Sequence, residues 1–326
     1  MWDFEIGRTI GIVVRTWPYV LLRLIIYSAI TLAYIIVSGT GAGIGWGAGH
    51  VFDDAGGPVG LAFWGGIVGF SLVSIVLYWV REYMLYLVKA GHIAVMVHLI
   101  EGRDIPGGQG QLAYGRGIVT ERFAEANVLF ALDQLIKGVL AAITGLLGGI
   151  AAFIPIPGLD GLIRIVNAVI RMSVTYVDEI ILGYNIRVGS TTPFETGRLG
   201  LVLYAQNGTT MVKNAAWLTA LIWVVGGAMF LMFLVPAGWI VYTMPGQPAG
   251  WVFVFAIVLA WGFVSAFIEP FAIAALMQVY FRTIEGQVPD AEWDSRLESA
   301  SRKFRDLKDR AQEELRGAFG RPSTAN

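Results

Sequence analysis

Five polar or charged side chains interrupt an apolar stretch at residues 161–187: Arg164, Asn167, Arg171, Asp178 and Glu179. Because Arg164, Arg171 and Asp178 are seven residues apart, they drift by only about 20° per step around a helix and share one face. A charge near the centre of a bilayer costs on the order of 3 kcal/mol or more. This face must therefore lie against protein or a water-filled cavity. The pattern predicts either a polar pathway through the membrane or a set of intramembrane ion pairs.

Arg171 is the most informative of these residues. It lies near the middle of the stretch, and no carboxylate occurs three or four residues away on either side. Any partner must therefore come from another helix, and the candidates are Asp133, Glu269 or a second protomer. Arg171 would then be an anion-attracting site or part of a pore-lining ring. The alternative is a structural ion pair that locks two helices together.

Two acidic positions lie towards the cytoplasmic ends of apolar stretches, at Asp178-Glu179 and at Glu269. They predict a charged vestibule or proton relay, or else ordinary interfacial charge at helix ends. Pro270 removes an intrahelical hydrogen bond beside Glu269, so we expect a kink there. Arg23 lies one turn inside the first apolar stretch, where a long cationic side chain is expected to snorkel to the interface.

Thiol, metal and nucleotide chemistry have little support. The chain has no cysteine, which excludes a thiolate nucleophile or a zinc–thiolate site. His92 and His98 are six residues apart, unlike the i, i+4 pair of a helical zinc site, and we expect an ordinary polar surface there. Residues 39–49 have glycine at every second position. A phosphate-binding glycine loop follows a strand and opens a helix, whereas this run follows an apolar stretch, so we expect an outer loop. We predict no enzyme activity, cofactor or metal.

Composition places the chain among membrane proteins. Of its residues, 56% are hydrophobic and only 14% are charged, whereas a soluble domain is roughly a quarter charged. A bilayer requires about 20 apolar residues per helix. Such stretches occur at 18–37, 59–80, 128–154, 161–187, 215–241 and 251–281. The sequence therefore predicts an all-α polytopic membrane protein with about six transmembrane helices arranged as three hairpins.

Polar helices are expected between and after these hairpins. Amphipathic interfacial helices are predicted over 1–16, 111–126 and 194–213. A charged helix over 290–319 carries an apolar stripe, and we expect it to dock on the other cytoplasmic helices or to pair between protomers. Its residues are Trp293, Leu297, Ala300, Phe304, Leu307, Ala311 and Leu315.

The distribution of positive charge sets the predicted topology. Apart from Arg164 and Arg171, every one of the 23 Lys and Arg residues falls in a segment that lies inside when both termini are cytoplasmic. This asymmetry indicates an even number of crossings in a bacterial cytoplasmic (inner) membrane. One alternative keeps that parity: residues 128–185 form a re-entrant hairpin that turns at Ile-Pro-Ile-Pro-Gly, 154–158.

An internal repeat is also visible. Gly102, Pro106 and Asn127 recur 87 residues later as Gly189, Pro193 and Asn214. Helix breaks are expected at Gly102–Pro106, Gly189–Pro193 and Gly286–Pro289. We predict a transmembrane domain over 1–286 with approximate repeats at 1–102, 103–189 and 190–286. A cytoplasmic helix and tail follow over 287–326.

Two functions follow from these patterns. The first is a channel or transporter for a small ion or solute, which uses the polar face of the fourth helix together with Glu269. The alternative is a non-catalytic scaffold or assembly subunit, with its cytoplasmic helices contacting a second copy or other membrane-complex partners. Membrane lipid is expected as a partner in either case, and a net charge of −1 gives no reason to expect nucleic acid. The lead-in helix, asparagine and hairpin around Asn214 resemble the membrane core of choline transporter-like proteins, over less than half of the chain.

Overall fold

The computed structural model describes residues 2–51, 57–105, 110–123, 126–152, 174–244, 247 and 249–319. These residues form helices joined by turns, and no strand occurs among them, so the predicted all-α class is confirmed. The chain divides into two compact units. Unit 1 comprises Met1–Thr16, Lys89–Ala220 and Phe271–Asn326, and unit 2 comprises Trp17–Val88 and Leu221–Pro270.

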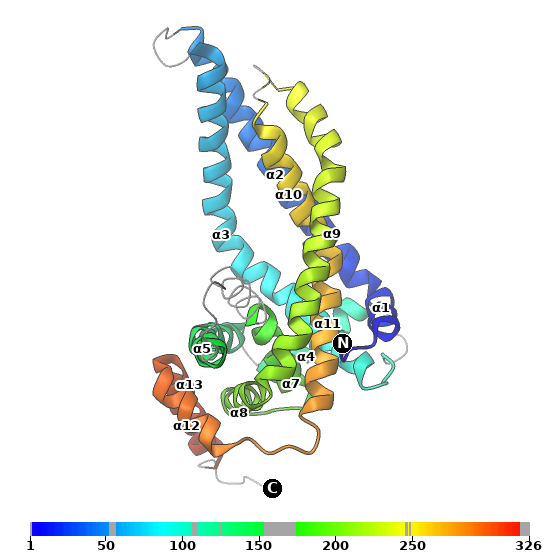
Figure 1. Ribbon diagram of the computed structural model, residues 1–326, viewed down its shortest axis with the longest axis vertical. Coiled ribbons are helices and arrows are strands. Elements are labelled where there is room, and N and C mark those ends of the chain that lie inside the picture. Colours follow the sequence, from blue (N-terminus) through cyan, green and yellow to red (C-terminus); the bar gives the residue numbers. More distant parts are fainter. Residues whose placement is uncertain are drawn as a thin grey trace, which may run out of the picture. The chain divides into compact units, whose positions relative to one another are not determined.

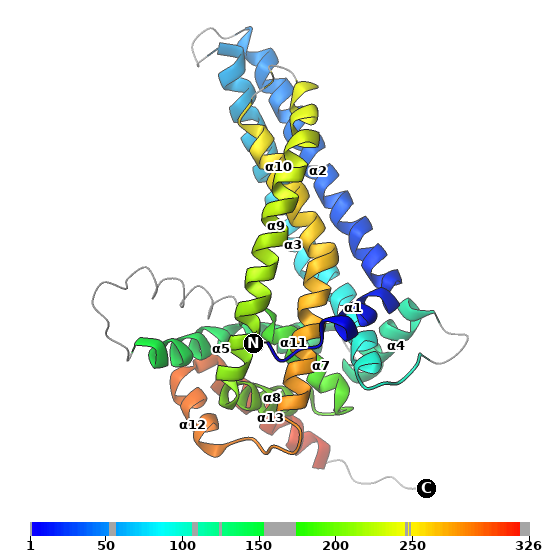
Figure 2. The same cartoon turned by 45° about the vertical axis from the view of Figure 1, so that its right-hand side comes forward.

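Unit 2 is built from long apolar helices that run beside one another (Figures 1 and 2). It contains α2 (Trp17–Gly49), the first part of α3 (Gly57–Ile100) and the later part of α9 (Gly208–Tyr242). It also contains α10 (Trp251–Phe263), which continues through the π-helical turn η2 (Val264–Ile268).

Four helices among the described residues are long and apolar enough to cross a membrane: Trp17–Gly49, Gly57–Leu77, Gly208–Tyr242 and Trp251–Thr283. They correspond to the predicted first, second, fifth and sixth membrane helices and indicate an integral membrane protein. The segment 128–154 is not among the four, and residues 153–173 lie outside the described part. Six crossings, three hairpins and the re-entrant alternative therefore stay predictions.

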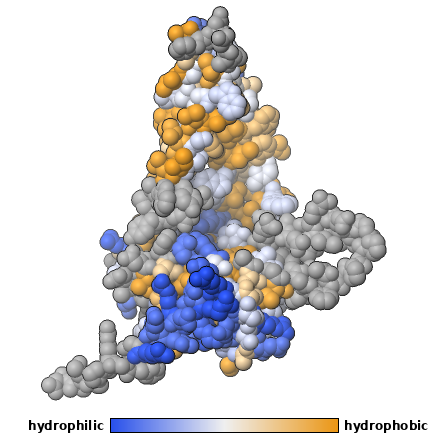
Figure 3. All heavy atoms as spheres, turned by 90° about the vertical axis from the view of Figure 1, so that its left-hand side faces the viewer, coloured by the Kyte–Doolittle hydropathy of each residue, from blue (hydrophilic) through white to orange (hydrophobic). Residues whose placement is uncertain are grey.

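The outward surface of unit 2 is hydrophobic. Large apolar side chains such as Ile36, Val68, Val235 and Trp239 are exposed on its helices, and orange hydrophobic residues cover this unit in the view of Figure 3. Blue hydrophilic residues gather instead on unit 1. A protein surrounded by water rarely exposes apolar area on this scale, so the surface of unit 2 is suited to contact with lipid.

The prediction that residues 39–49 form an outer loop is wrong, because Gly39 to Gly49 belong to α2. A Cβ added at Gly41 would lie 2.2 Å from the carbonyl oxygen of Gly65 in α3, and one added at Gly45 would lie 2.0 Å from that of Leu61. The glycines let two helix backbones approach more closely than any side chain allows. This packing outweighs the low helix propensity of glycine, about 1 kcal/mol per residue.

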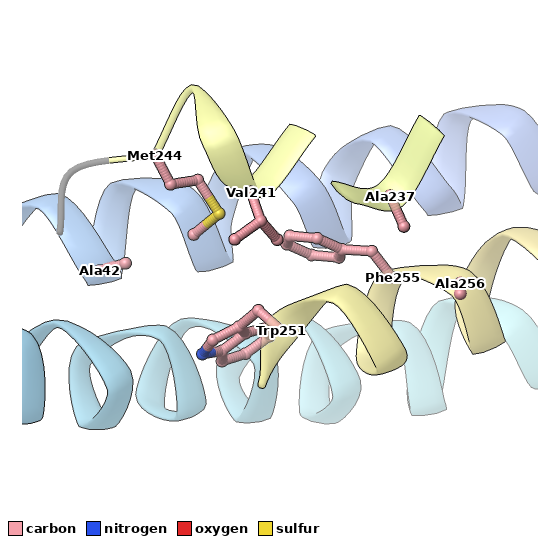
Figure 4. Close-up of a cluster of buried hydrophobic side chains, with 7 residues drawn as sticks. All are labelled: Ala42, Ala237, Val241, Met244, Trp251, Phe255 and Ala256. Carbon is pink, nitrogen blue, oxygen red and sulfur yellow. The ribbon is translucent and has the colours of Figure 1, made fainter. Parts of the chain in front are cut away.

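The core of unit 2 lies where α2, α9 and α10 meet. Figure 4 shows the ring of Phe255 beside Val241, with Trp251 one turn earlier on α10. Small residues complete the cluster, among them Ala42 and Ala256. Aromatic rings against alanines fix the spacing of these helices, because both side-chain types are rigid and fully buried.

We expect Gly45→Ala to destabilise the protein by about 1–3 kcal/mol, because the added methyl group would separate α2 from α3. Gly47 provides the control, since no atom lies within 4 Å of a Cβ added there. Gly47→Ala should leave the stability unchanged or raise it by up to about 1 kcal/mol. Thermal unfolding of the two variants in detergent measures the difference, and equal melting temperatures would contradict the packing role.

Unit 1 is built from shorter helices. Its complete elements are α1 (Ile6–Arg15), α4 (Gln111–Phe123), α5 (Ala126–Ala152), η1 (Val174–Tyr176), α7 (Val177–Arg187), α8 (Pro193–Gln206), α12 (Ala291–Ala300) and α13 (Arg302–Phe319). The end of α3, the start of α9 and most of α11 (Glu269–Thr283) complete it. Helix α3 continues beyond the predicted stretch 59–80 to Ile100.

Three glycines follow the ends of long helices in unit 1, where the sequence predicts helix breaks. Gly102, Gly189 and Gly286 have φ values of 73°, 64° and 72° after α3, α7 and α11. The amide of Arg103 donates to His98 O, and that of Ser190 donates to Asn185 O, so both ends close with the same backbone pattern. Only glycine adopts this left-handed conformation without a steric cost. The predicted breaks are confirmed, whereas the wider repeat stays a prediction.

The C-terminal helices α12 and α13 dock on other helices of unit 1, which is one of the two arrangements predicted for the C-terminal segment. Phe304, Leu307 and Ala311 of the predicted stripe are buried, and α13 packs against α8 and α5. The segment forms two helices and not one, because Ser301 is extended and its hydroxyl caps α13 at the amide of Phe304.

Glu314 of α13 caps the start of α8. Its Oε2 accepts hydrogen bonds from the amides of Phe194 (3.1 Å) and Glu195 (3.3 Å), while Thr192 at the N-cap position makes no side-chain capping bond. The carboxylate thus supplies acceptors that α8 lacks in its own sequence. Burial raises the pKa of Glu314 above its ordinary value of 4.5, although the two amides oppose that shift.

The raised pKa of Glu314 gives a signed pH dependence. The folded state holds the proton more tightly than the unfolded state, so the free energy of unfolding decreases as pH rises from 4.5 towards the folded pKa. Glu314→Gln should remove this contribution while keeping an acceptor. Glu314→Ala should lose about 1 kcal/mol at all pH values, because two amides lose their cap. Thermal unfolding between pH 4 and 8 tests both variants, and a glutamine variant with the wild-type slope would contradict the assignment.

Candidate functional site

The predicted polar residues fall into three groups. Arg164, Asn167 and Arg171 lie outside the described residues. Asp178 and Glu179 form part of the first turn of α7 in unit 1, and Glu269 begins α11 in unit 2. Asp178 and Glu179 therefore belong to one site in unit 1, and Glu269 belongs to a second site in unit 2.

Asp178 and Glu179 belong to a mixed-charge network, which consists of Lys89, Asp133, Lys137, Asp178 and Glu179. Lys137 Nζ lies 2.8 Å from Asp133 Oδ2 and 3.8 Å from Asp178 Oδ2. Lys89 Nζ lies 3.3 Å from Glu179 Oε1. Helices α3, α5 and α7 each contribute to the network, so it ties three elements of unit 1 together.

Local sequence explains part of this arrangement. Asp133 and Lys137 are four residues apart on α5, a spacing that places both on one helix face. Asp178 and Glu179 lie at the N-terminal end of α7, where the helix dipole favours negative charge. Lys89 and Lys137 were missed as site residues by the sequence analysis. The i, i+4 spacing of Asp133 and Lys137 inside an apolar stretch is the signal that could have identified Lys137.

The three carboxyl groups of the network are buried, with residue exposures of 2% for Asp133, 8% for Asp178 and 6% for Glu179. All three lie outside the four apolar helices. Burial raises the pKa of Asp178 well above its ordinary value, and the charge of neighbouring Glu179 adds to that shift. Burial also raises the pKa of Asp133, against the opposing effect of Lys137. Chemically, the network sets the ammonium groups of Lys89 and Lys137 against three buried carboxyl groups and so offsets part of their charge.

Glu269 pairs with Arg23 inside unit 2. Arg23 Nη2 lies 2.7 Å from Glu269 Oε2, and the side chain of Arg23 is only 1% exposed. The prediction that Arg23 snorkels to the interface is therefore wrong. Pairing between the helices replaces hydration, because the carboxylate of Glu269 stabilises a guanidinium group that does not reach water.

A backbone irregularity accompanies this ion pair. The π-helical turn η2 directly precedes Glu269, whose amide donates to the carbonyl of Val264 five residues earlier. Pro270 has no amide hydrogen to continue the regular ladder, and π turns are a usual way to absorb such a disruption. The helix type thus changes beside Pro270, whereas the kink predicted there stays a prediction. Such turns occur frequently at functional sites.

His92 corrects another prediction, because it lies in the core of unit 1 and not on a polar surface. The residue is fully buried, and its Nε2 lies 2.9 Å from Thr16 Oγ1. By contrast, His98 lies at the surface between Asp104 O and the hydroxyl of Tyr114. Among the described residues, no group of three or more His, Asp and Glu side chains is arranged to hold a metal ion.

Comparison of the chain with protein-family models, with curated proteins and with solved structures gives no match.

We expect Arg23→Ala to destabilise the protein by about 3–5 kcal/mol, because it leaves the carboxylate of Glu269 buried without its guanidinium partner. The double variant Arg23→Met with Glu269→Gln should recover most of that loss. Arg296 and Glu292 form an exposed i, i+4 pair on α12 and serve as the matched control. Arg296→Ala should cost no more than about 0.5 kcal/mol. Unfolding of all variants in detergent decides the matter, and an Arg23→Ala cost equal to that of Arg296→Ala would refute the pairing.

Proposed function

We propose that this chain is a membrane-anchored helical platform that holds a partner protein at the surface of a bacterial cytoplasmic membrane. This is the non-catalytic scaffold function that the sequence analysis leaves as its alternative. In this proposal the four apolar helices form the anchor. Unit 1 supplies a hydrated helical surface for the partner.

The contact between α13 and the middle of α5 carries the proposal. A Cβ added at Gly138 would lie 2.6 Å from Cγ of Lys303, so the stem of a lysine lies against the centre of the predicted third crossing. The outer face of α13 is charged and exposed, with Arg305, Asp309 and Glu313 among its residues. A helix with such a face requires water, which argues against placing α5 in the hydrocarbon. Four crossings then preserve the predicted even number.

The pairing of the described acidic residues also supports a platform. Glu269 is paired with Arg23, Glu179 with Lys89, and Lys137 lies near Asp178. Charges held in such pairs join helices to one another, which is the structural alternative that the sequence leaves open. A permeation pathway would instead require these groups to face a passage for the solute.

The exposed face of α13 is where we expect the partner to bind. A photo-activated cross-linking residue at the exposed position Gln312 should capture a protein in native membranes. The same residue at Ile36, which is exposed on α2, should capture lipid only. Absence of protein cross-links from Gln312 and the exposed positions Asp309 and Glu313 would refute the proposal.

Transport is the second candidate function, and the buried Arg23–Glu269 pair beside a π turn favours it. The platform proposal expects no flux of ions or small solutes through purified protein in proteoliposomes. Flux that Glu269→Gln or Arg171→Ala changes, while the protein stays folded, would establish transport in its place.

A further inference from the structure

A pocket of about 260 Å³ lies in unit 1 where three helices end. Ile100 at the end of α3, Arg187 at the end of α7 and Phe281 near the end of α11 contribute to its wall. Residues of the N-terminal segment, between Asp3 and Arg8, also line the pocket. Neither the mixed-charge network nor the docked C-terminal helices contribute to this pocket.

The pocket carries charges of both signs, three arginines and four carboxylates: Arg8, Arg187, Arg282, Asp3, Glu5, Glu101 and Glu285. Part of this charge stabilises the fold. Arg8 Nη2 donates to Ile100 O at 2.6 Å, and Arg187 Nη1 donates to Phe281 O at 3.1 Å. These guanidinium groups satisfy carbonyls that helix ends leave without partners.

Some groups in the pocket keep bonding capacity that the fold does not use. Among the described residues, the carboxylate of Glu285 makes no hydrogen bond or ion pair. Arg8 gives one nitrogen to Ile100 O, which leaves most of its five N–H donors for other acceptors. Arg282 donates to Asp3 O and lies 4.0 Å from Glu5. The pocket therefore offers a donor for an anionic group and an acceptor for a cationic group.

The charge balance selects the class of ligand. Glu101 is paired with Arg187, and Asp3 is paired with Lys213 outside the pocket, so part of this charge is already neutralised. The carboxylates of Glu5 and Glu285 oppose the entry of a simple anion, and the guanidinium groups of Arg8 and Arg282 oppose a simple cation. A molecule with both charges satisfies both sets of groups, and the volume is below the roughly 300–1,000 Å³ typical of drug-sized ligands. We propose that this pocket binds a small zwitterion, with its anionic oxygens on Arg8 and its ammonium group on Glu285.

The ammonium and anionic groups could belong to a free amino acid or to the headgroup of a zwitterionic lipid. In both molecules the ammonium nitrogen and the anionic oxygens are separated by only a few bonds. The inference does not depend on the platform function, because binding can be measured without a protein partner and without flux.

The test is isothermal titration of the full-length protein in an uncharged detergent. Glycine and phosphoethanolamine are the zwitterionic probes, and acetate and methylammonium are the single-charge controls. We expect at least one zwitterion to bind at millimolar or tighter concentration, and at least tenfold more tightly than either control. Preference for phosphoethanolamine assigns the site to a lipid headgroup, whereas preference for glycine assigns it to a free amino acid.

Glu285→Gln is the decisive variant, because this side chain makes no contact that the fold uses. It should weaken binding of the zwitterion at least tenfold while the melting temperature stays unchanged. Asp309→Asn removes one exposed carboxylate of α13 away from the pocket and should bind as the wild type does. Wild-type affinity in Glu285→Gln, or equal binding of zwitterions and single-charge probes, would overturn the proposal.

Discussion

The cost of removing a charge from water is the constraint on which this structure depends. An isolated ion buried among apolar side chains is strongly unfavourable, and in the described part of the chain each buried Arg, Asp or Glu has an opposite charge beside it. Arg23 and Glu269 meet this requirement inside the apolar helices of unit 2. In unit 1, Lys89 and Lys137 do the same for three carboxyl groups. Separating these helices would leave a buried charge without its partner, so the pairs hold the helices together.

Backbone groups at helix ends obey the same rule. The amides at the start of α8 are satisfied by Glu314 from the C-terminal helix, and the carbonyl of Ile100 at the end of α3 is satisfied by Arg8. In both cases a side chain from the far end of the chain supplies what the local sequence lacks. The terminal segments of unit 1 are therefore part of its structure and not appendages to it.

Glycine has two separate roles. In α2 and α3 it removes side chains so that two apolar helices pack backbone to backbone, which is a membrane-type contact. After α3, α7 and α11 it adopts a left-handed conformation that ends the helix and turns the chain. The apolar helices of unit 2 and the charged surface residues of unit 1 are the two features on which the proposed platform function rests.

The sequence by itself determined the features that depend on local composition. Apolar length predicted the helices that became α2, α3, α9 and α10–α11, and Gly102, Gly189 and Gly286 marked where helices end. The apolar stripe of Phe304, Leu307 and Ala311 likewise predicted a helix with one face to bury. These signals are local because helix formation depends on neighbours within a few residues.

Only the tertiary structure decided which residues meet. The partner of Arg23 is Glu269, far along the chain, and no spacing rule connects the two. The glycines at 39–49 were predicted to form an outer loop, yet they are helical and pack against α3. His92 is buried for the same reason, since the residues that cover it come from other elements. Such outcomes depend on desolvation and close packing between segments that are far apart in the chain. A sequence pattern reports only on residues within a few helical turns of one another.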